Sequence, residues 1–357
     1  MARNTLARID IEAVAHNLAR IRALAPDSRV MAVVKADAYG HRLDLCLPAL
    51  ADADMLAVAT LEEARAIRRL GSSLPVILLE GLIHDGDLSV AADLALELTI
   101  HHPAQVEALA RFGRAPTPRL WLKLDSGMHR LGMDAVGGRE AHRRLLALPG
   151  AEEVNLITHF ASADDDDPAM TRDQIRRFHA AAEGLSGELC MANSAAILAH
   201  PEARADWVRA GIMLYGISPH PERTGQSLGL KPVMTLTTEL IAINLVPKGE
   251  RIGYGGRFIA PESMRIGVAG IGYGDGYPRS LVDGTPVRVG DRDCRLVGRV
   301  SMDMITIDLG NVPDARIGDP VVLWGRGLPV EQVARCADTI AYELVCRITR
   351  RVRYRAI

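Results

Sequence analysis

The chain has 357 residues, of which 48% are hydrophobic and 24% are charged, so it can bury a large core and has room for two domains. Its 42 basic and 44 acidic side chains give a net charge of -2, which excludes the strongly basic surface typical of proteins that bind nucleic acids or anionic membranes. The sequence has no apolar run long enough to span a bilayer and no apolar stretch of the signal-peptide kind at its N-terminus, so we expect a cytoplasmic enzyme that acts on a small molecule.

The first predicted element is a helix over residues 10–24. Ile11, Val14 and Leu18 are spaced as on one helical face, Asp10 precedes them as a capping residue, and Pro26 follows the end.

Eight short apolar runs then alternate with amphipathic stretches up to about residue 215. The runs lie at 30–34, 55–58, 76–79, 96–100, 120–124, 154–160, 188–192 and 207–211. Strands that alternate with helices predict a parallel sheet, and eight such units fit a closed (β/α)8 barrel of the TIM type. An open doubly wound sheet is the alternative, although no GxGxxG motif follows the first run.

Beyond residue 225 the pattern changes to β-branched residues separated by Gly, Pro and Asp turns, which predicts an antiparallel β domain. We expect one late helix over 330–339 and one or two strands over 342–357. The predicted domains are therefore 1–225 and 226–357.

Lysine occurs only four times, at Lys35, Lys123, Lys231 and Lys248. Arginine can replace lysine as a surface charge, but it keeps its proton in proteins and so cannot serve as an amine nucleophile or base. Each lysine is therefore either spared by chance or retained for its amine. The five cysteines are far apart and form no CxxC pair, so we predict neither a disulfide framework nor a metal site.

Polar residues follow several of the predicted barrel strands, at the end where barrels of this kind carry their active sites. The polar residues are Lys35, Lys123 inside the fifth run, Arg130, His159, Asn193, Ser194 and Arg209, and Gly211 and Ile212 present backbone N–H groups after the eighth run. A phosphate cradle at Gly211 and Ile212 beside a strand-end lysine is what pyridoxal phosphate needs, namely amide donors for its anion and an amine for a covalent bond. Taken singly, each is open to a structural interpretation: Lys35 as a lysine that extends into solvent, His159 and Arg209 as satisfied polar residues.

Five of the seven tyrosines adjoin a glycine, namely Tyr39, Tyr215, Tyr254, Tyr273 and Tyr277. Glycine allows a tight turn that presents the ring at a loop, although the same pairs also occur in ordinary β turns.

These residues lie in nine motifs by which the chain resembles the alanine racemases, a family of pyridoxal-phosphate enzymes. The motifs, in chain order, are AVVKADAYGH (32–41), KLDSGMHRLG (123–132), THFA (158–161), ANSAA (192–196), VRAGIMLYG (208–216), IGYGGRF (252–258), GYGDGYPR (272–279), GRVSMDM (298–304) and YELVCRI (342–348).

The resemblance implies a head-to-tail homodimer in which each active site takes residues from both chains. It implies that Lys35 binds the cofactor and handles the substrate proton on one face, while Tyr254 of the partner subunit handles it on the opposite face. The implied reaction is the interconversion of L-alanine and D-alanine.

The resemblance also assigns the remaining site residues. Tyr39, Ser194, Gly211, Ile212 and Tyr342 match the phosphate contacts, and we place Asn193 with the same cofactor-binding group. Arg209 corresponds to the arginine that faces the pyridine nitrogen, and His159 to the residue that connects it toward Tyr254.

At the substrate side, Arg130 matches the arginine near the cofactor's phenolic oxygen and the substrate carboxylate. The backbone of Met302 from the other subunit would assist this contact. Asp303 matches a residue near the substrate carboxylate and the entry path, which Tyr273 and Tyr342 would narrow. Lys123 matches a lysine that is carbamylated in some members and then orients the arginine.

Three departures from the family pattern concern substrate breadth. Arg42 follows AYGH where many members have glycine, Ser301 stands where cysteine is common, and GYGGRF replaces the commoner SYG-type context of the catalytic tyrosine. A racemase of broader amino-acid specificity is therefore the first alternative, and a non-catalytic pyridoxal-phosphate carrier is the second. The carriers lack the β domain that holds Tyr254 here.

Overall fold

The computed structural model describes residues 4–82 and 84–357, which divide into two compact units. The first, here called the barrel unit, consists of Asn17–Ala38 and Cys46–Leu214. The second, the β unit, consists of the N-terminal segment up to His16, the short segment Tyr39–Leu45, and Tyr215–Ile357. The chain therefore passes between the units several times.

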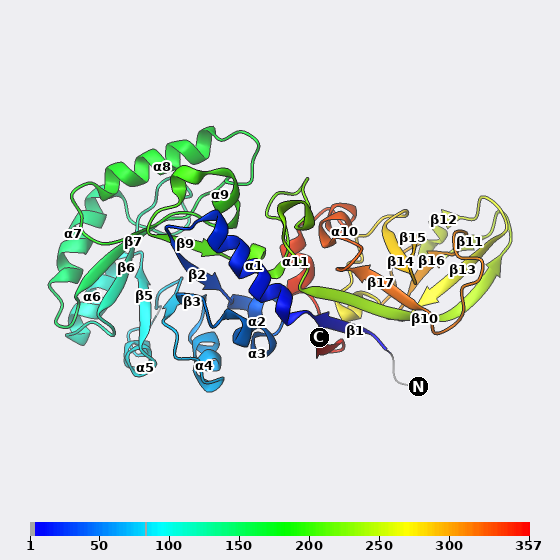
Figure 1. The fold of residues 1–357 in the computed structure, drawn as a ribbon, viewed down its shortest axis with the longest axis horizontal. Helices are drawn as coiled ribbons and strands as arrows, with labels where there is room; N and C mark the ends of the chain where they lie inside the picture. Colours follow the sequence, from blue (N-terminus) through cyan, green and yellow to red (C-terminus); the bar gives the residue numbers. More distant parts are fainter. Residues whose placement is uncertain (1–3, 83) are drawn as a thin grey trace. The chain divides into compact units, whose positions relative to one another are not determined.

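The barrel unit contains a closed barrel of eight parallel strands arranged in chain order, which confirms the predicted (β/α)8 barrel (Figure 1). The strands are β2 (Arg29–Val33), β3 (Met55–Val58), β4 (Val76–Leu78), β5 (Leu96–Ile100), β6 (Arg119–Lys123), β7 (Glu153–Ile157), β8 (Leu189–Cys190) and β9 (Trp207–Ala210). The ring is closed by parallel pairing of β2 with β9, where Met31 lies opposite Arg209.

Helices alternate with these strands along the chain, and in Figure 1 helices α4 to α8 surround the barrel. The helices are α1 (Ile11–Leu24), α2 (Lys35–Tyr39), α3 (Leu43–Cys46), α4 (Leu61–Arg69), α5 (Asp87–Asp93), α6 (Pro103–Phe112), α7 (Ala135–Leu146), α8 (Ala169–Ala182) and α9 (Ser194–Ala199), with 3-10 turns η1 (Leu47–Leu50), η2 (Pro201–Ala203) and η3 (Ile212–Tyr215). Helix α4 begins with a capping box, in which the side chains of Thr60 and Glu63 each accept a hydrogen bond from the backbone N–H of the other residue.

Two tryptophans pack against each other in the interior of the barrel unit. Trp121 and Trp207 are fully buried, with ring centroids 5.7 Å apart in an edge-to-face arrangement. The buried carboxylate of Glu97 accepts the indole N–H of Trp121 at 2.6 Å and pairs with Arg119 at 2.6 Å. Burial raises the pKa of Glu97, and these two partners oppose that rise.

The β unit is built on one eight-stranded sheet in the order β13-β16-β15-β14-β17-β10-β1-β18. Because β10 also pairs with β13, six of these strands close into an antiparallel barrel. The strands are β1 (Leu6–Ile9), β10 (Met234–Val246), β13 (Met264–Ala269), β14 (Pro286–Val289), β15 (Arg292–Leu296), β16 (Ile305–Asp308), β17 (Pro320–Trp324) and β18 (Arg353–Ala356). A separate hairpin pairs β11 (Arg251–Ile252) with β12 (Phe258–Ile259). Turns η4 (Gln226–Leu228), η5 (Tyr254–Gly256) and η6 (Tyr273–Asp275) and helices α10 (Val330–Cys336) and α11 (Ala341–Cys346) complete the unit.

Two elements differ from the sequence expectation. Residues 6–9 form β1, which pairs antiparallel with β10 and parallel with β18, so the first strand of the chain belongs to the β unit. The expected strand beginning at residue 342 is instead α11, whose buried Ala341, Leu344 and Val345 follow helical spacing. Only the last part of this tail, 353–356, is a strand.

No helix in the described part of the chain has the length and apolar character needed to cross a membrane.

Candidate active site

Lys35 lies just beyond β2, where the backbone makes one left-handed turn. Ala36, Asp37, Ala38 and Tyr39 have φ values of 53°, 54°, 56° and 51°. Non-glycine residues rarely adopt this conformation, and each such residue costs about 1–2 kcal/mol. The turn is tied to the barrel by Glu63, whose carboxylate accepts the N–H of Ala36 at 2.7 Å. A strained segment held in this way fixes the direction in which the chain leaves the lysine.

Four cationic side chains surround one imidazole at the C-terminal end of the barrel strands. Burial, together with the positive charges of Arg209, Lys123, Arg130 and Lys35, lowers the pKa of His159 to about 2. The structure therefore brings these five predicted residues into one electrostatic neighbourhood. A site of this charge favours anionic ligand groups such as phosphates and carboxylates.

Arg209 and His159 are connected directly. Arg209 donates from Nη2 to the carbonyl of Thr158 at 3.0 Å and to Nδ1 of His159 at 2.9 Å. Since a guanidinium only donates, Nδ1 is the acceptor, and the single proton of the neutral imidazole lies on Nε2. His159 is thus a donor on the side away from Arg209.

Arg209 is 5% exposed, and each acceptor that it reaches among the described residues is uncharged. Its third partner is Sγ of Cys190, at 3.2 Å. Burial raises the pKa of Cys190, so the sulfur stays a thiol. A buried guanidinium whose partners are uncharged is stabilised by each further hydrogen-bond acceptor. An unprotonated pyridine nitrogen is such an acceptor. The residues at the barrel mouth fit pyridoxal phosphate in this respect.

Lys123 is the last residue of β6, and its ammonium is destabilised. Burial lowers its pKa to about 8, with the charges of Arg209, Arg130 and Lys35 acting in the same direction. A larger share of this amine is neutral near pH 7 than for an ordinary lysine. A neutral amine is the form that reacts with carbon dioxide.

The predicted phosphate-binding backbone lies after β8 and β9. The N–H of Gly211 donates to Oγ of Ser194 at 2.9 Å, so the two residues are in direct contact. Asn193 caps α9 by accepting the N–H of Ala196 at 3.0 Å. Ile212 is buried and begins the turn η3.

Arg130 is presented by a loop that Asp125 organises. The Asp125 carboxylate accepts the N–H groups of Gly127, Met128 and His129 at 3.0 to 3.1 Å. This arrangement supports the next residue, Arg130, which is exposed.

Sequence reasoning missed three residues that hold the site: Asp125, Cys190 and Glu63. Asp125 had a signal, because Asp followed two residues later by Gly is typical of a side-chain-stabilised turn. Cys190 gave none, since its contact with Arg209 depends on two neighbouring strands. Glu63 was recognisable as a helix-capping residue, but its bond to Ala36 was not.

The remaining predicted residues belong to the β unit. Tyr39 lies beside Tyr342, with ring centroids 6.0 Å apart, and stacks on Tyr215 at 5.1 Å. Tyr342 is on α11, so these two predicted phosphate contacts come from opposite ends of the chain.

Tyr254 begins the turn η5 and is 68% exposed. The glycines on either side, Gly253 and Gly255, both have a φ of 73°, which a residue with a Cβ rarely adopts. The backbone therefore turns sharply before and after the ring and leaves the phenol exposed on its unit.

Met302 and Asp303 lie on the loop between β15 and β16. Met302 is 52% exposed, and its carbonyl accepts the N–H of Gly274 at 2.9 Å. Asp303 forms an ion pair with Arg351.

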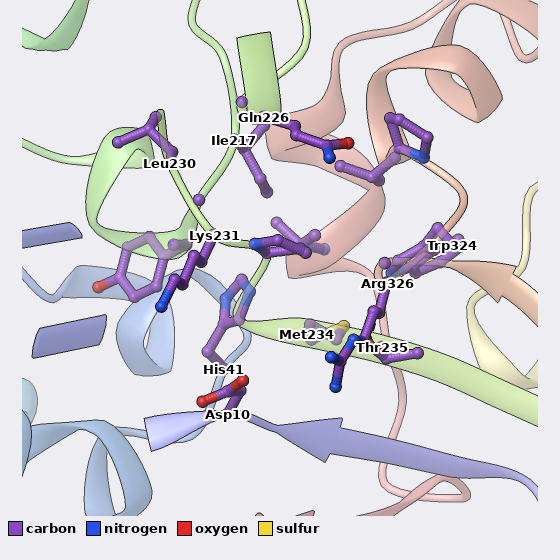
Figure 2. Close-up of a pocket in the computed structure, with 18 of the residues that line it drawn as sticks. Asp10, His41, Ile217, Gln226, Leu230, Lys231, Met234, Thr235, Trp324 and Arg326 are labelled. Atoms are coloured by element: carbon purple, nitrogen blue, oxygen red, sulfur yellow. Dashed lines mark hydrogen bonds between the residues drawn. The ribbon is translucent and has the colours of Figure 1, made fainter. Parts of the chain in front are cut away.

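A cavity of about 480 Å³ also lies in the β unit (Figure 2). His41, Lys231, Trp324 and Arg326 are among the residues that line it, and none of the predicted site residues does. It is a separate feature of this unit.

Comparisons with known proteins cover almost the whole chain. Residues 9–219 match the family model described as alanine racemase, N-terminal domain, and residues 233–356 match the one described as alanine racemase, C-terminal domain. The alanine racemase of Nitrosococcus oceani is 51% identical over 96% of this chain and 97% of its own. The crystal structure of the biosynthetic alanine racemase from Pseudomonas aeruginosa superposes with a TM-score of 0.96 at 46% identity, with 100% of both chains covered. The structure of alanine racemase from Acinetobacter baumannii gives a TM-score of 0.95 at 41% identity, covering 99% of this chain and 100% of its own.

Proposed function

The chain belongs to the alanine racemase family, and from this premise we propose that it interconverts L-alanine and D-alanine with pyridoxal phosphate bound through Lys35 and with Tyr254 of the partner subunit as the second proton-transfer group. It is an isomerase, as its full-length relatives are, and the family depends on pyridoxal phosphate. The observation that carries the proposed site is the group of four cations around His159, with Lys35 among them.

Pyridoxal phosphate, when bound, supplies an electron-withdrawing ring that makes the substrate's Cα proton acidic. Lys35 would hold the cofactor through its amine. Once the substrate's amine has displaced it, the same amine would be free to take or return the Cα proton on one face. Tyr254 of the partner subunit holds the exchangeable proton on the opposite face. Because one group removes the proton as the other delivers one, the configuration at Cα is inverted.

Arg209 and His159 control the ring side of the site. A guanidinium does not give up its proton, so Arg209 would donate a hydrogen bond to the ring nitrogen of bound pyridoxal phosphate and would leave that nitrogen unprotonated. The unprotonated ring would withdraw less negative charge from the substrate, which would limit side reactions. His159, whose proton is on Nε2, can donate on toward Tyr254 of the partner subunit.

The substrate carboxylate is bound by Arg130 and by the N–H of Met302 from the partner, because a carboxylate accepts hydrogen bonds and the Met302 carbonyl is already an acceptor. Asp303 of the partner lies beside this contact. Carbamylation of Lys123 would replace a destabilised ammonium by an anion, and this anion could hold the Arg130 guanidinium in place.

The phosphate is bound by hydroxyl groups and backbone amides rather than by the lysines. The residues assigned to it are Tyr39, Asn193, Ser194, Gly211, Ile212 and Tyr342. Two observations support this group: the contact between Gly211 and Ser194, and the packing of Tyr39 beside Tyr342.

The shared site implies a homodimer in which the barrel domain, residues 1–225, of one chain works with the β domain, residues 226–357, of the other. The exposure of Tyr254 on its own unit supports this arrangement, because an exposed phenol is able to contact a cofactor that is bound in the other subunit.

The cofactor assignment is tested on the purified holoenzyme. Reduction with borohydride should remove the visible absorbance band, and peptide mapping should find the reduced cofactor on Lys35. The peptides containing Lys231 and Lys248 serve as internal controls and should stay unmodified. Attachment to another lysine would contradict the assignment.

The second proton-transfer group is tested with Tyr254→Phe. We expect loss of racemisation by at least about 100-fold with the cofactor's absorbance retained, because the phenylalanine ring keeps the shape and removes only the exchangeable proton. Wild-type rates in this variant would refute the two-base assignment. Deuterium exchange at Cα, compared for alanine, serine and basic amino acids, separates strict alanine specificity from the broader alternative.

A further inference from the structure

Arg351 connects two carboxylates of different exposure in the β unit. Its Nε lies 3.3 Å from Oδ1 of Asp275, whose side chain is 2% exposed. Its Nη2 lies 2.5 Å from Oδ1 of Asp303, whose side chain is 47% exposed. One guanidinium therefore reaches from the interior of the unit to the surface loop that carries Met302 and Asp303.

The segments that Arg351 joins are also joined by the backbone. In the turn η6, Gly272 donates its N–H to the Asp275 carboxylate at 2.9 Å, and Tyr273 donates to the carbonyl of Ser301 at 3.0 Å. The guanidinium lies directly against Gly274, because a Cβ placed on that glycine would be 2.3 Å from Nη1 of Arg351. Glycine at this position thus leaves the space that the arginine occupies.

We propose that Arg351 is a positioning residue for substrate binding, which holds the Asp303 carboxylate in place and neutralises its charge beside the site of the substrate carboxylate. The proposal rests on the proposed function, in which Met302 and Asp303 lie next to the carboxylate of alanine. It adds a residue that touches neither substrate nor cofactor.

The charges explain why the contact matters for an anionic group. Two carboxylates and one guanidinium sum to -1, and removal of the guanidinium leaves -2 (-1 + -1). Of the two, Asp275 is buried and accepts Gly272 N–H, whereas Asp303 is half-exposed on the loop. Without this guanidinium, Asp303 more strongly repels a second carboxylate that binds nearby.

The test is the steady-state kinetics of alanine racemisation by the dimeric holoenzyme. Arg351→Ala should raise KM about 3- to 10-fold while kcat changes less than about twofold, as a weak charge repulsion acts on binding. Adding Asp303→Asn to this variant should bring KM back toward the wild-type value, because it removes the unneutralised charge. Arg351→Lys keeps the charge without the forked geometry, so its KM should lie between those of the wild type and Arg351→Ala.

Arg295→Ala is the matched control. Arg295 also pairs with a carboxylate of the β unit, Asp308, at 2.9 Å, but on the strands β15 and β16. We expect its KM and kcat to equal those of the wild type. Arg351→Lys keeps a cation beside the buried Asp275 and so provides a folded variant if Arg351→Ala unfolds.

A purely structural role of Arg351 predicts a different result, since Asp303→Asn would then not restore KM. An unchanged KM in Arg351→Ala, or a raised KM that the double variant fails to lower, overturns the proposal. If instead the wild-type enzyme does not racemise alanine in the same assay, the proposed function is wrong, and the inference that rests on it is wrong as well.

Discussion

At the residue scale, the buried imidazole of His159 makes the stability of the folded chain depend on acid. Its pKa is about 2 in the folded state and about 6.5 in an unfolded chain, so below pH 6.5 only the unfolded state binds the proton. The free energy of unfolding therefore falls as the pH falls. His159→Gln removes this term, and between pH 6 and pH 4 we expect it to gain about 1.4 kcal/mol per pH unit relative to the wild type.

The measurement is urea denaturation at pH 7, 6, 5 and 4 with equal cofactor occupancy in both proteins. His179→Gln is the control, because His179 is an exposed residue of helix α8. A difference between His159→Gln and wild type that stays constant with pH would contradict the displaced pKa.

Lys123 makes the stability of the folded chain depend on pH at the alkaline end of the range. Its pKa is about 8 in the folded state against about 10.5 in an unfolded chain, so between these values only the unfolded state keeps the proton. In buffer free of carbon dioxide, the wild type should therefore gain roughly 1.4 kcal/mol per pH unit relative to Lys123→Met from pH 8 to pH 10.

The same pair of proteins tests the modification of Lys123. With ¹³C-labelled bicarbonate, a carbamate carbon signal should be present in the wild type and absent in Lys123→Met. A signal of equal intensity in both would place the carbamate on another amine.

Lys35 and Lys123 could be singled out from the sequence because lysine is scarce and both lie at the end of a predicted strand, and Arg209 because of its place in the last predicted strand of the barrel. It could not show that the partners of Arg209 among the described residues are uncharged, because Cys190 lies on β8 and Thr158 directly follows β7. The lowered pKa of His159 likewise depends on burial and on charges that are 29 to 124 residues away in the chain.

At the element scale, the left-handed turn after Lys35 is the feature that local propensity predicts least. Lysine, alanine and aspartate in KADAY are compatible with an ordinary right-handed helix. The turn forms because the tertiary structure holds both its ends: Glu63 accepts the N–H of Ala36, and Gly40 lies against the backbone of Val345. The tail from residue 342 is predicted to form strands, but its buried residues Ala341, Leu344 and Val345 follow helical spacing and form α11.

Gly40 and Gly71 provide a matched test of this packing. Both have positive φ values, 74° and 84°, so replacement by alanine strains the backbone in each case by about 1 kcal/mol. At Gly40 a Cβ would also lie 2.1 Å from the carbonyl oxygen of Val345, whereas at Gly71 nothing lies within 4 Å. We expect Gly40→Ala to lower the free energy of unfolding by several kcal/mol, and Gly71→Ala by only about 1 kcal/mol. Equal losses in thermal denaturation would show that this close contact does not form.

At the scale of the whole molecule, the composition and the order of apolar runs predicted the (β/α)8 barrel and the antiparallel β domain, and both are confirmed. The contribution of the first residues to the β unit was not predicted, since a four-residue strand that pairs with residues 234–237 leaves no local signal.

The proposed dimer makes a prediction about mixtures of inactive proteins. Lys35→Ala and Tyr254→Phe are each expected to lack racemisation as homodimers. In a mixed dimer one site carries both substitutions, and the other combines the intact Lys35 with the intact Tyr254. When subunits exchange at equal concentrations, half of the dimers are mixed, so we expect recovery of about a quarter of the wild-type activity. A mixture that stays inactive after verified subunit exchange would place Lys35 and Tyr254 of one chain in the same site.

The strand β1 also determines when the β unit can be completed during synthesis. β1 leaves the ribosome before both of its neighbours, because β10 and β18 lie more than 220 and about 350 residues downstream. The backbone hydrogen-bonding groups of β1 therefore have no strand to pair with while the barrel is translated. A chain cut before residue 353 would lack β18 and would expose β1 as an open sheet edge, a surface that promotes aggregation and degradation.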